Sequence, residues 1–284
     1  MHNRRFVLLL AVVLCAWSCG DRAPDSPAAA ARLALRSLDR GAPLPAYRAL
    51  PPRWRRDVQA LVTRAIGAVD PEAWDDIGKG IGFLADGIRR YPEVILPLPI
   101  PSEEDRIPVL RILVALEEHF DDAGVLRHEV ARSLDVDRFL DDPGDEVLPL
   151  LVDLAGRTRP CPEWADVHEV FRSLGVLRPD AASAEMDEAG PPGDDGIATL
   201  VIRFGDGRHE VPFTQVEGRW VPQVLAVAWD PGFAAADAAL DAWIIRWTEN
   251  REVVRIRAES FRIAAEHFAA TGDISALLTT LPPL

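Results

Sequence analysis

The chain has a single lysine, few cysteines and no apolar run long enough to cross a membrane as a helix. Of its 31 basic residues only Lys79 is a lysine, which excludes most lysine-based catalysis. The longest apolar run, from Phe6 to Trp17, has 12 residues, whereas a spanning helix needs about 20. Three cysteines in 284 residues also exclude a disulfide-rich scaffold.

Positive charge is the minority sign. The sequence has 45 acidic and 31 basic residues, a formal net charge of −14. A surface that neutralises nucleic-acid phosphates needs the opposite balance, so the charge indicates no nucleic-acid partner. The hydrophobic fraction of 48% is typical of a globular protein, and the length fits about two domains.

The N-terminus has the pattern of an export signal. Arg4 and Arg5 precede the apolar run, and the small residues Ala16 and Ser18 follow its core. This order predicts a secretory signal peptide over residues 1–18.

The segment from Leu14 to Gly20, with Ser18 directly before Cys19, resembles the lipobox of bacterial lipoproteins, although Ala16 stands where leucine is usual. The resemblance implies that Cys19 is lipidated and that its acyl chains hold the protein on a membrane, facing the periplasm or the cell exterior. Residues 19–26 would then be the lipidated cysteine and a short tether. The alternative is an ordinary signal peptide cleaved at the same place, which leaves a soluble protein beginning with Cys19.

Loss of the signal removes two arginines and one cysteine. The mature chain then has 29 basic and 45 acidic residues, a charge of −16, which anionic headgroups would repel. Cys161 has no intramolecular partner if Cys19 is acylated, and a bridge between Cys19 and Cys161 is the rival interpretation.

The mature chain is predicted to be α+β and mostly α, beginning with a layer of helices over residues 27–178. Ser26, Pro27 and Gly41 mark the ends of the first helix, and Asp70 with Pro71 marks the start of another. Residues 92–101, with four prolines, are expected to be extended. Apolar periodicity predicts helices over 27–40, 54–66, 71–88, 106–120, 125–140, 145–156 and 162–174.

The period changes in residues 179–230, which are predicted to form a small antiparallel β-meander. Strands are expected at 197–204, 208–216 and 219–221, joined by glycine-containing turns. We expect Trp220, next to the second turn, to dock this sheet onto the C-terminal helix, because an aromatic ring so close to a turn is buried only against another element.

Residues 231–284 are predicted to be a long C-terminal helical segment that packs back on the helical layer. An apolar residue recurs at every seventh position, and we call these six residues the heptad seam: Phe233, Leu240, Trp247, Val254, Phe261 and Phe268. A break is expected between Thr248 and Arg251, where polar residues interrupt the pattern. The seam is expected to cover residues 50–120.

No catalytic, cofactor or metal motif is present in the mature sequence, so no cofactor is expected. The glycines at 78, 80, 82 and 87 indicate close helix packing. A polar turn explains His119, Asp121, Asp122 and His128 better than a metal site does. Core packing is the first interpretation of the tryptophans, and the alternative is an apolar ligand cavity or a docking surface lined by Trp54, Trp74, Trp220, Trp229 and Trp247.

Short runs in the body of the chain resemble an uncharacterised group of exported bacterial proteins. The resemblance covers roughly residues 45–160 and 200–230, implies a helical region followed by a β-meander, and assigns no activity. It is carried by Leu50-Pro51 with Asp57, Asp70-Pro71-Glu72 with Trp74, Leu134-Asp135-Val136 with Phe139-Leu140 and Gly144, and Val216, Gly218 and Trp220-Val221-Pro222 with Trp229.

Three functions follow as hypotheses. The first is a non-enzymatic, lipid-anchored protein that binds a protein or a cell-envelope component. The second is a carrier of an amphipathic small molecule in a tryptophan-lined cavity. The third is a carboxylate-dependent hydrolase, which should have a cleft with convergent carboxylates and a strongly shifted pKa.

Overall fold

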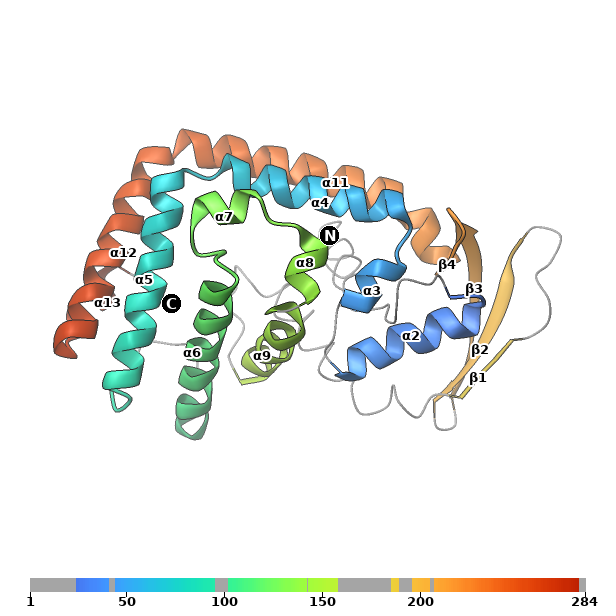
Figure 1. Ribbon diagram of the computed structural model, residues 1–284, viewed down its shortest axis with the longest axis horizontal. Coiled ribbons are helices and arrows are strands. Elements are labelled where there is room, and N and C mark those ends of the chain that lie inside the picture. The colour runs from blue at the N-terminus through green and yellow to red at the C-terminus, as the bar shows by residue number, and fades with distance from the viewer. Residues whose placement is uncertain are drawn as a thin grey trace. The chain divides into compact units, whose positions relative to one another are not determined.

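The computed structural model describes residues 24–40, 44–94, 102–141, 143–157, 185–188, 196–204 and 207–280 (Figure 1). Helices dominate, with one small antiparallel sheet and a long helical C-terminal part, so the predicted α+β, mostly α class is confirmed. The chain divides into two compact units. Unit 1 comprises residues 1–60, 136–149 and 166–238, and unit 2 comprises residues 61–135, 150–165 and 239–284.

Unit 1 contains the sheet, whose four strands pair in chain order and antiparallel. The strands are β1 (Glu185–Glu188), β2 (Ala198–Phe204), β3 (Gly207–Val216) and β4 (Arg219–Pro222). Glu217 and Gly218 join β3 to β4 with φ angles of 49° and 75°, as a tight two-residue hairpin requires. The predicted meander is thus present. The strand β1 was not predicted, because Met186 is its only apolar residue.

The helix α2 (Pro27–Arg40) packs against the sheet, where it contacts β1, β2 and β4 (Figure 1). Its N-terminus is capped as predicted, since the N–H of Ala29 donates to Oγ of Ser26 at 3.2 Å. Trp220 is buried, as the sequence predicts, and its strand β4 contacts α2. The docking of Trp220 on the C-terminal helix stays a prediction. The helix α2 thus packs on the sheet although the two elements are far apart in the sequence.

Unit 1 also contains α3 (Leu44–Ala49), the first half of α4 (Pro52–Ala68), α8 (Val136–Asp141), the N-terminal half of α9 (Pro143–Arg157) and the first part of α11 (Gln223–Glu249). Arg48 Nε donates to Oδ1 of Asp137 at 2.8 Å, and the N–H of Val136 donates to Oε1 of Gln59 at 2.8 Å. These contacts hold α8 against α3 and α4.

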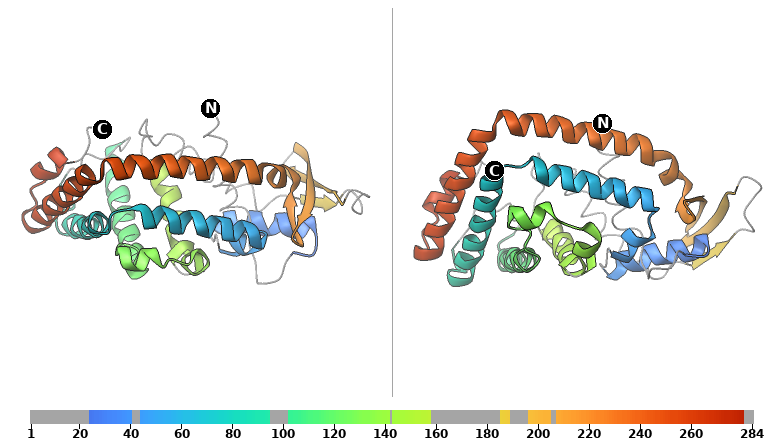
Figure 2. Two further views of the ribbon diagram at one scale, coloured as in Figure 1. Left: turned by 90° about the horizontal axis from the view of Figure 1, so that it is seen from above. Right: turned by 45° about the horizontal axis from the view of Figure 1, so that its top comes forward.

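Unit 2 is organised by a parallel pair of helices, α5 (Pro71–Arg90) and α12 (Arg251–Thr271), which lie side by side in both views of Figure 2. Asp70 caps α5 as predicted, accepting from the N–H of Ala73 at 3.1 Å. A Cβ atom on Gly80 would lie 2.5 Å from the ring of Phe261, and one on Gly87 would lie 2.3 Å from the ring of Phe268. The glycines are therefore notches that receive two rings of the heptad seam.

Within unit 2, α5 also contacts α6 (Arg106–Asp122) and α7 (His128–Arg132), and α12 contacts α13 (Ser275–Thr280). The core cluster contains Ile88, Leu110 and Phe268, which come from three helices. Only one helix was predicted over 125–140, and the structure has α7 there, followed by α8 of unit 1. A 3-10 turn (Glu103–Asp105) precedes α6, and the C-terminal half of α9 also belongs to unit 2.

The C-terminal segment begins earlier than predicted. The helix α11 (Gln223–Glu249) starts directly after β4, eight residues before the predicted boundary at 231, and Pro231 lies inside it. The residue four positions before this proline, Val227, is 72% exposed, so water can satisfy the carbonyl that the proline leaves without a donor. The predicted break is confirmed, because Asn250 separates α11 from α12.

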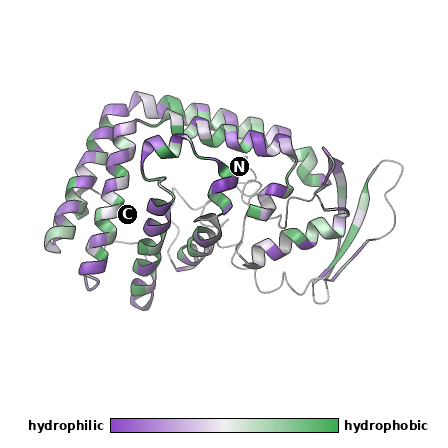
Figure 3. Ribbon diagram, viewed as in Figure 1, coloured by the Kyte–Doolittle hydropathy of each residue, from purple (hydrophilic) through white to green (hydrophobic). Residues whose placement is uncertain are grey.

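Polar and apolar residues alternate along α5 and α12, as the hydropathy colouring of Figure 3 shows, and β2 is coloured largely hydrophobic. No described helix combines the length and the apolar character that a membrane crossing needs. Several expectations lie outside the described residues: the signal peptide with Cys19, the extended stretch after Val94, and the helix over 162–174 with Cys161.

Candidate functional site

The candidate site is an open groove in unit 2, which we call the acidic groove. It has a volume of about 590 Å³ along α5 and α6 and continues past Gly78 toward α7. Seven carboxylates and three cationic side chains line it: Asp75, Asp86, Glu117, Glu118, Asp121, Asp122 and Glu129, with Lys79, Arg89 and Arg127.

The periodicity of α5 positions one wall. Asp75, Lys79, Gly82, Asp86 and Arg89 follow one another at steps of three and four, so they share one face of the helix. That face is next to the apolar stripe that packs in the core. The groove is open at its floor because Gly82 has no side chain there.

The turn between α6 and α7 closes one end of the groove. A Cβ atom on Gly78 would lie 2.1 Å from the carbonyl oxygen of Leu126, so only glycine allows this turn to sit on α5. The indole N–H of Trp74 donates to the carbonyl of Val125 at 3.0 Å, and the N–H of His128 donates to Oδ1 of Asp75 at 2.7 Å. These bonds fix the turn against α5.

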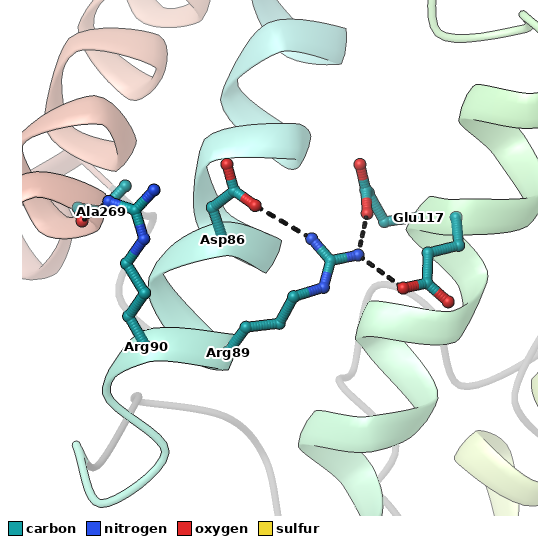
Figure 4. A network of polar contacts seen from close by, with 6 residues as sticks. Asp86, Arg89, Arg90, Glu117 and Ala269 are labelled. Carbon is teal, nitrogen blue, oxygen red and sulfur yellow. Dashed lines mark hydrogen bonds and ion pairs between the residues drawn. The ribbon is translucent and has the colours of Figure 1, made fainter.

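Arg89 is the centre of an ion-pair network within the groove (Figure 4). Its guanidinium contacts Oδ1 of Asp86 at 3.0 Å, Oε2 of Glu117 at 2.9 Å and Oε1 of Glu118 at 2.9 Å. The neighbouring Arg90 is turned away from the groove and donates to the carbonyl of Ala269 on α12 at 3.1 Å.

Glu117 is the one buried carboxylate of the groove, with 9% of its surface exposed. Burial raises the pKa of its carboxyl above the usual value, and the negative charges of Asp121 and Asp86 add to the rise. The Arg89 guanidinium opposes this rise. A carboxyl in such surroundings can hold a proton more readily than its neighbours do.

Lys79 is on the rim of the same groove, and its ammonium has no hydrogen bond or ion pair with any described residue. Since it is the only lysine of the chain, the groove contains the only lysine amine of the protein.

Metal binding has no support in the described part of the chain, where no group of three or more histidine, cysteine or acidic residues could hold an ion. The turn residues considered as ligands serve other purposes. Asp121 and Asp122 line the groove, and His128 is buried, with Nε2 3.3 Å from the carbonyl of Ile66.

The predicted site tryptophans do not gather at one cavity. In unit 1, Trp54 and Trp229 are buried and stack with their ring centroids 4.2 Å apart. The indole N–H of Trp229 donates to Oδ2 of Asp57 at 3.0 Å. Trp220 is in the sheet. In unit 2, Trp74 packs against His128, and Trp247 contacts Trp243 at 5.0 Å. None of these rings lines the acidic groove.

Sequence reasoning missed Glu117, Arg89 and Lys79 as parts of one site. The available signal was the polar stripe from Asp75 to Arg89, which has the same spacing as the neighbouring apolar stripe. No protein-family model, curated protein or solved structure matches this chain.

Proposed function

We propose that this is an exported, lipid-anchored binding protein without catalytic activity, which binds a protein or cell-envelope component through the acidic groove. The anchor would be the acylated Cys19, and the protein would face the periplasm or the cell exterior. The export signal and the lipobox-like segment support the location. The groove supports the binding function.

The observation that carries the proposal is the charge of the groove, seven carboxylates against three cations. Such a surface attracts a positively charged segment, and arginine side chains pair with carboxylates through two parallel hydrogen bonds. Gly82 leaves room on the floor for the stems of long side chains. The partner chemistry is therefore a protein segment rich in arginine or lysine.

The single lysine makes the test specific to the groove. An amine-reactive photo-crosslinker on Lys79 should join the protein to its partner in isolated cell envelopes, because acylation blocks the N-terminal amine in a lipoprotein. The double variant Glu118→Arg with Asp122→Arg, which reverses two charges of the groove without adding an amine, should lose this product. The matched variant Glu259→Arg, an exposed charge reversal on α12, should retain it.

Equal crosslinking in the groove variant and in Glu259→Arg would contradict the proposal. So would a product that persists in Lys79→Arg, since that variant cannot be labelled in the groove.

The anchor is tested separately by growing cells with an alkyne fatty acid. The wild type should be labelled, and Cys19→Ala should not be. Equal labelling of the two proteins would rule out acylation at Cys19 and favour an ordinary signal peptide.

The environment of Glu117 favours a carboxylate-dependent hydrolase as the second candidate. A buried carboxyl with a raised pKa beside ionised carboxylates is an arrangement that general acid catalysis uses. The ion pair with Arg89 makes the hydrolase a weaker candidate, because the positive charge of Arg89 favours the ionised form of Glu117. A hydrolase would cleave its substrate and lose that activity in Glu117→Gln. The carrier hypothesis remains without a described cavity, since the tryptophan rings pack on one another or on their neighbours.

A further inference from the structure

Two arginine side chains of unit 1, Arg55 and Arg219, have no acidic partner among the described residues. Nε of Arg55 is buried and has no hydrogen-bond acceptor, and both side chains are half-buried. This is unexpected in a chain with 45 acidic and 31 basic residues, where a carboxylate should be the commonest neighbour of an arginine.

The fold brings these two residues together. The turn after β3 is tied to the N-terminus of α4, because the N–H of Arg53 donates to Oε2 of Glu217 at 2.8 Å. Arg55 is in the first turn of α4, and Arg219 is the first residue of β4, so both residues lie within two positions of this contact. Burial lowers the pKa of Arg219, and the positive charge of Arg55 lowers it further.

The nearby carboxylates are engaged elsewhere. Asp57 accepts from the indole N–H of Trp229 at 3.0 Å, and Asp230 pairs with the side chain of Arg53 at 2.7 Å. Glu217 caps α4. Two like charges that are partly withdrawn from water, with no counter-charge in the part of the chain that the structure describes, raise the free energy of the folded protein.

We propose that Arg55 and Arg219 form a binding site for the phosphate group of a soluble ligand. Two guanidinium groups supply a charge of +2, which matches a phosphate monoester dianion, and their N–H forks fit its oxygens. A soluble source is favoured over a lipid headgroup because a chain with a net charge of −14 is repelled by an anionic bilayer surface. This site is in unit 1 and is separate from the acidic groove.

Thermal unfolding of the full-length protein with inorganic phosphate at constant ionic strength is the first test. Phosphate should raise the Tm of the wild type. Arg55→Gln and Arg219→Gln should each bind phosphate at least about tenfold more weakly, the loss of one charge-assisted hydrogen bond. Arg56→Gln, an adjacent and exposed arginine, is the matched control and should respond as the wild type does.

The Tm without phosphate separates a ligand site from a structural role. Because each guanidinium repels the other, Arg55→Gln and Arg219→Gln should unfold at a temperature no lower than that of the wild type. A lower Tm for both, or a wild type that does not respond to phosphate, would overturn the proposal. An equal response to acetate would also overturn it, as would flotation with phosphatidylglycerol vesicles that depends on Arg55 and Arg219.

Discussion

Asp70 has two roles at the start of α5, because it caps the helix and pairs with Arg251 of α12. Its Oδ1 accepts from the N–H of Ala73 at 3.1 Å, and its Oδ2 accepts from Nε of Arg251 at 2.6 Å. Burial alone would raise the pKa of this carboxyl, but these hydrogen bonds and the charge of Arg251 hold it below the usual value of 3.8. The ionised form therefore stabilises the fold.

This pKa direction predicts a pH-dependent loss in Asp70→Asn. A lowered pKa contributes stability above the unfolded pKa and loses it as the pH falls through the folded pKa. Asparagine still caps a helix, so the variant removes only the charge, and it should cost about 1 kcal/mol at pH 7. Urea unfolding should show the two proteins converging below about pH 4.

Glu72→Gln is the control for that experiment. Glu72 is exposed and pairs with Arg255 at a longer 3.4 Å, so its effect at pH 7 should be within about 0.5 kcal/mol. A difference for Asp70→Asn that stays constant from pH 7 to pH 3 would contradict the role of the charge.

The burial of Trp220 also leads to a quantitative prediction, because only 7% of its surface is exposed. Trp220→Ala should lower the free energy of unfolding by about 3 to 5 kcal/mol, measured by urea denaturation. Val224→Ala, at a position 70% exposed, should change it by less than about 0.5 kcal/mol. Equal effects in the two variants would show that Trp220 contributes nothing to the packing of β4.

At the scale of elements, the notches on α5 fix its register against α12. Gly80 receives Phe261 and Gly87 receives Phe268, and each pair is separated by 181 residues, as are Asp70 and Arg251. The two helices therefore run parallel, and the seven-residue spacing of the seam matches the spacing of the glycines.

Gly87→Ala should destabilise the protein although alanine is the better helix former. Alanine favours the helix by about 1 kcal/mol, but its Cβ would lie 2.3 Å from the fully buried ring of Phe268. Such overpacking costs about 1 to 3 kcal/mol in the core and more when the ring cannot move. Differential scanning calorimetry should show a lower Tm.

Gly67→Ala in α4 is the matched control, because no atom lies within 4 Å of the added Cβ. It should be neutral or stabilising by up to about 1 kcal/mol. If both glycine variants were stabilising, the notch at Gly87 would not be a packing requirement.

The helix ends were the most predictable elements, and the contacts between distant elements were the least. Asp70 with Pro71 and Ser26 with Pro27 are local signals, and the structure has both helix starts where they were expected. The acidic groove and the arginine pair depend on which helix faces which, and this is set by contacts between residues more than 25 positions apart.

At the scale of the whole molecule, the units are assembled from separated segments of the chain. Unit 2 includes residues 61–135 and 239–284. The predicted regions were contiguous, so these two segments were placed in different parts of the protein, the helical layer and the C-terminal segment. The apolar pattern of a helix indicates which face is buried but not which other element covers that face. The heptad seam was expected to cover residues 50–120, and two of its residues, Phe261 and Phe268, do pack on α5.

Deletion of residues 233–284 should leave an aggregated product. It removes α12 and α13, and with them Phe268, Ala265 and Leu277 of the unit 2 core, so α5 would present its apolar face to water. Size-exclusion chromatography with light scattering should show large species. A soluble monomer with native-like helix content would indicate that the seam serves a partner or a second copy of the chain.

The parallel pairing of α5 with α12 also sets the order in which parts of the unit 2 core can form. The N-terminal part of a chain leaves the ribosome first, so α5 is made long before the helix that fills its notches. Bringing segments 181 residues apart together costs about 4 to 5 kcal/mol of loop entropy, which makes this a late and slow step of folding. Until Phe268 has been synthesised, the core that it forms with Ile88 and Leu110 is incomplete, and the apolar face of α5 has no partner from α12.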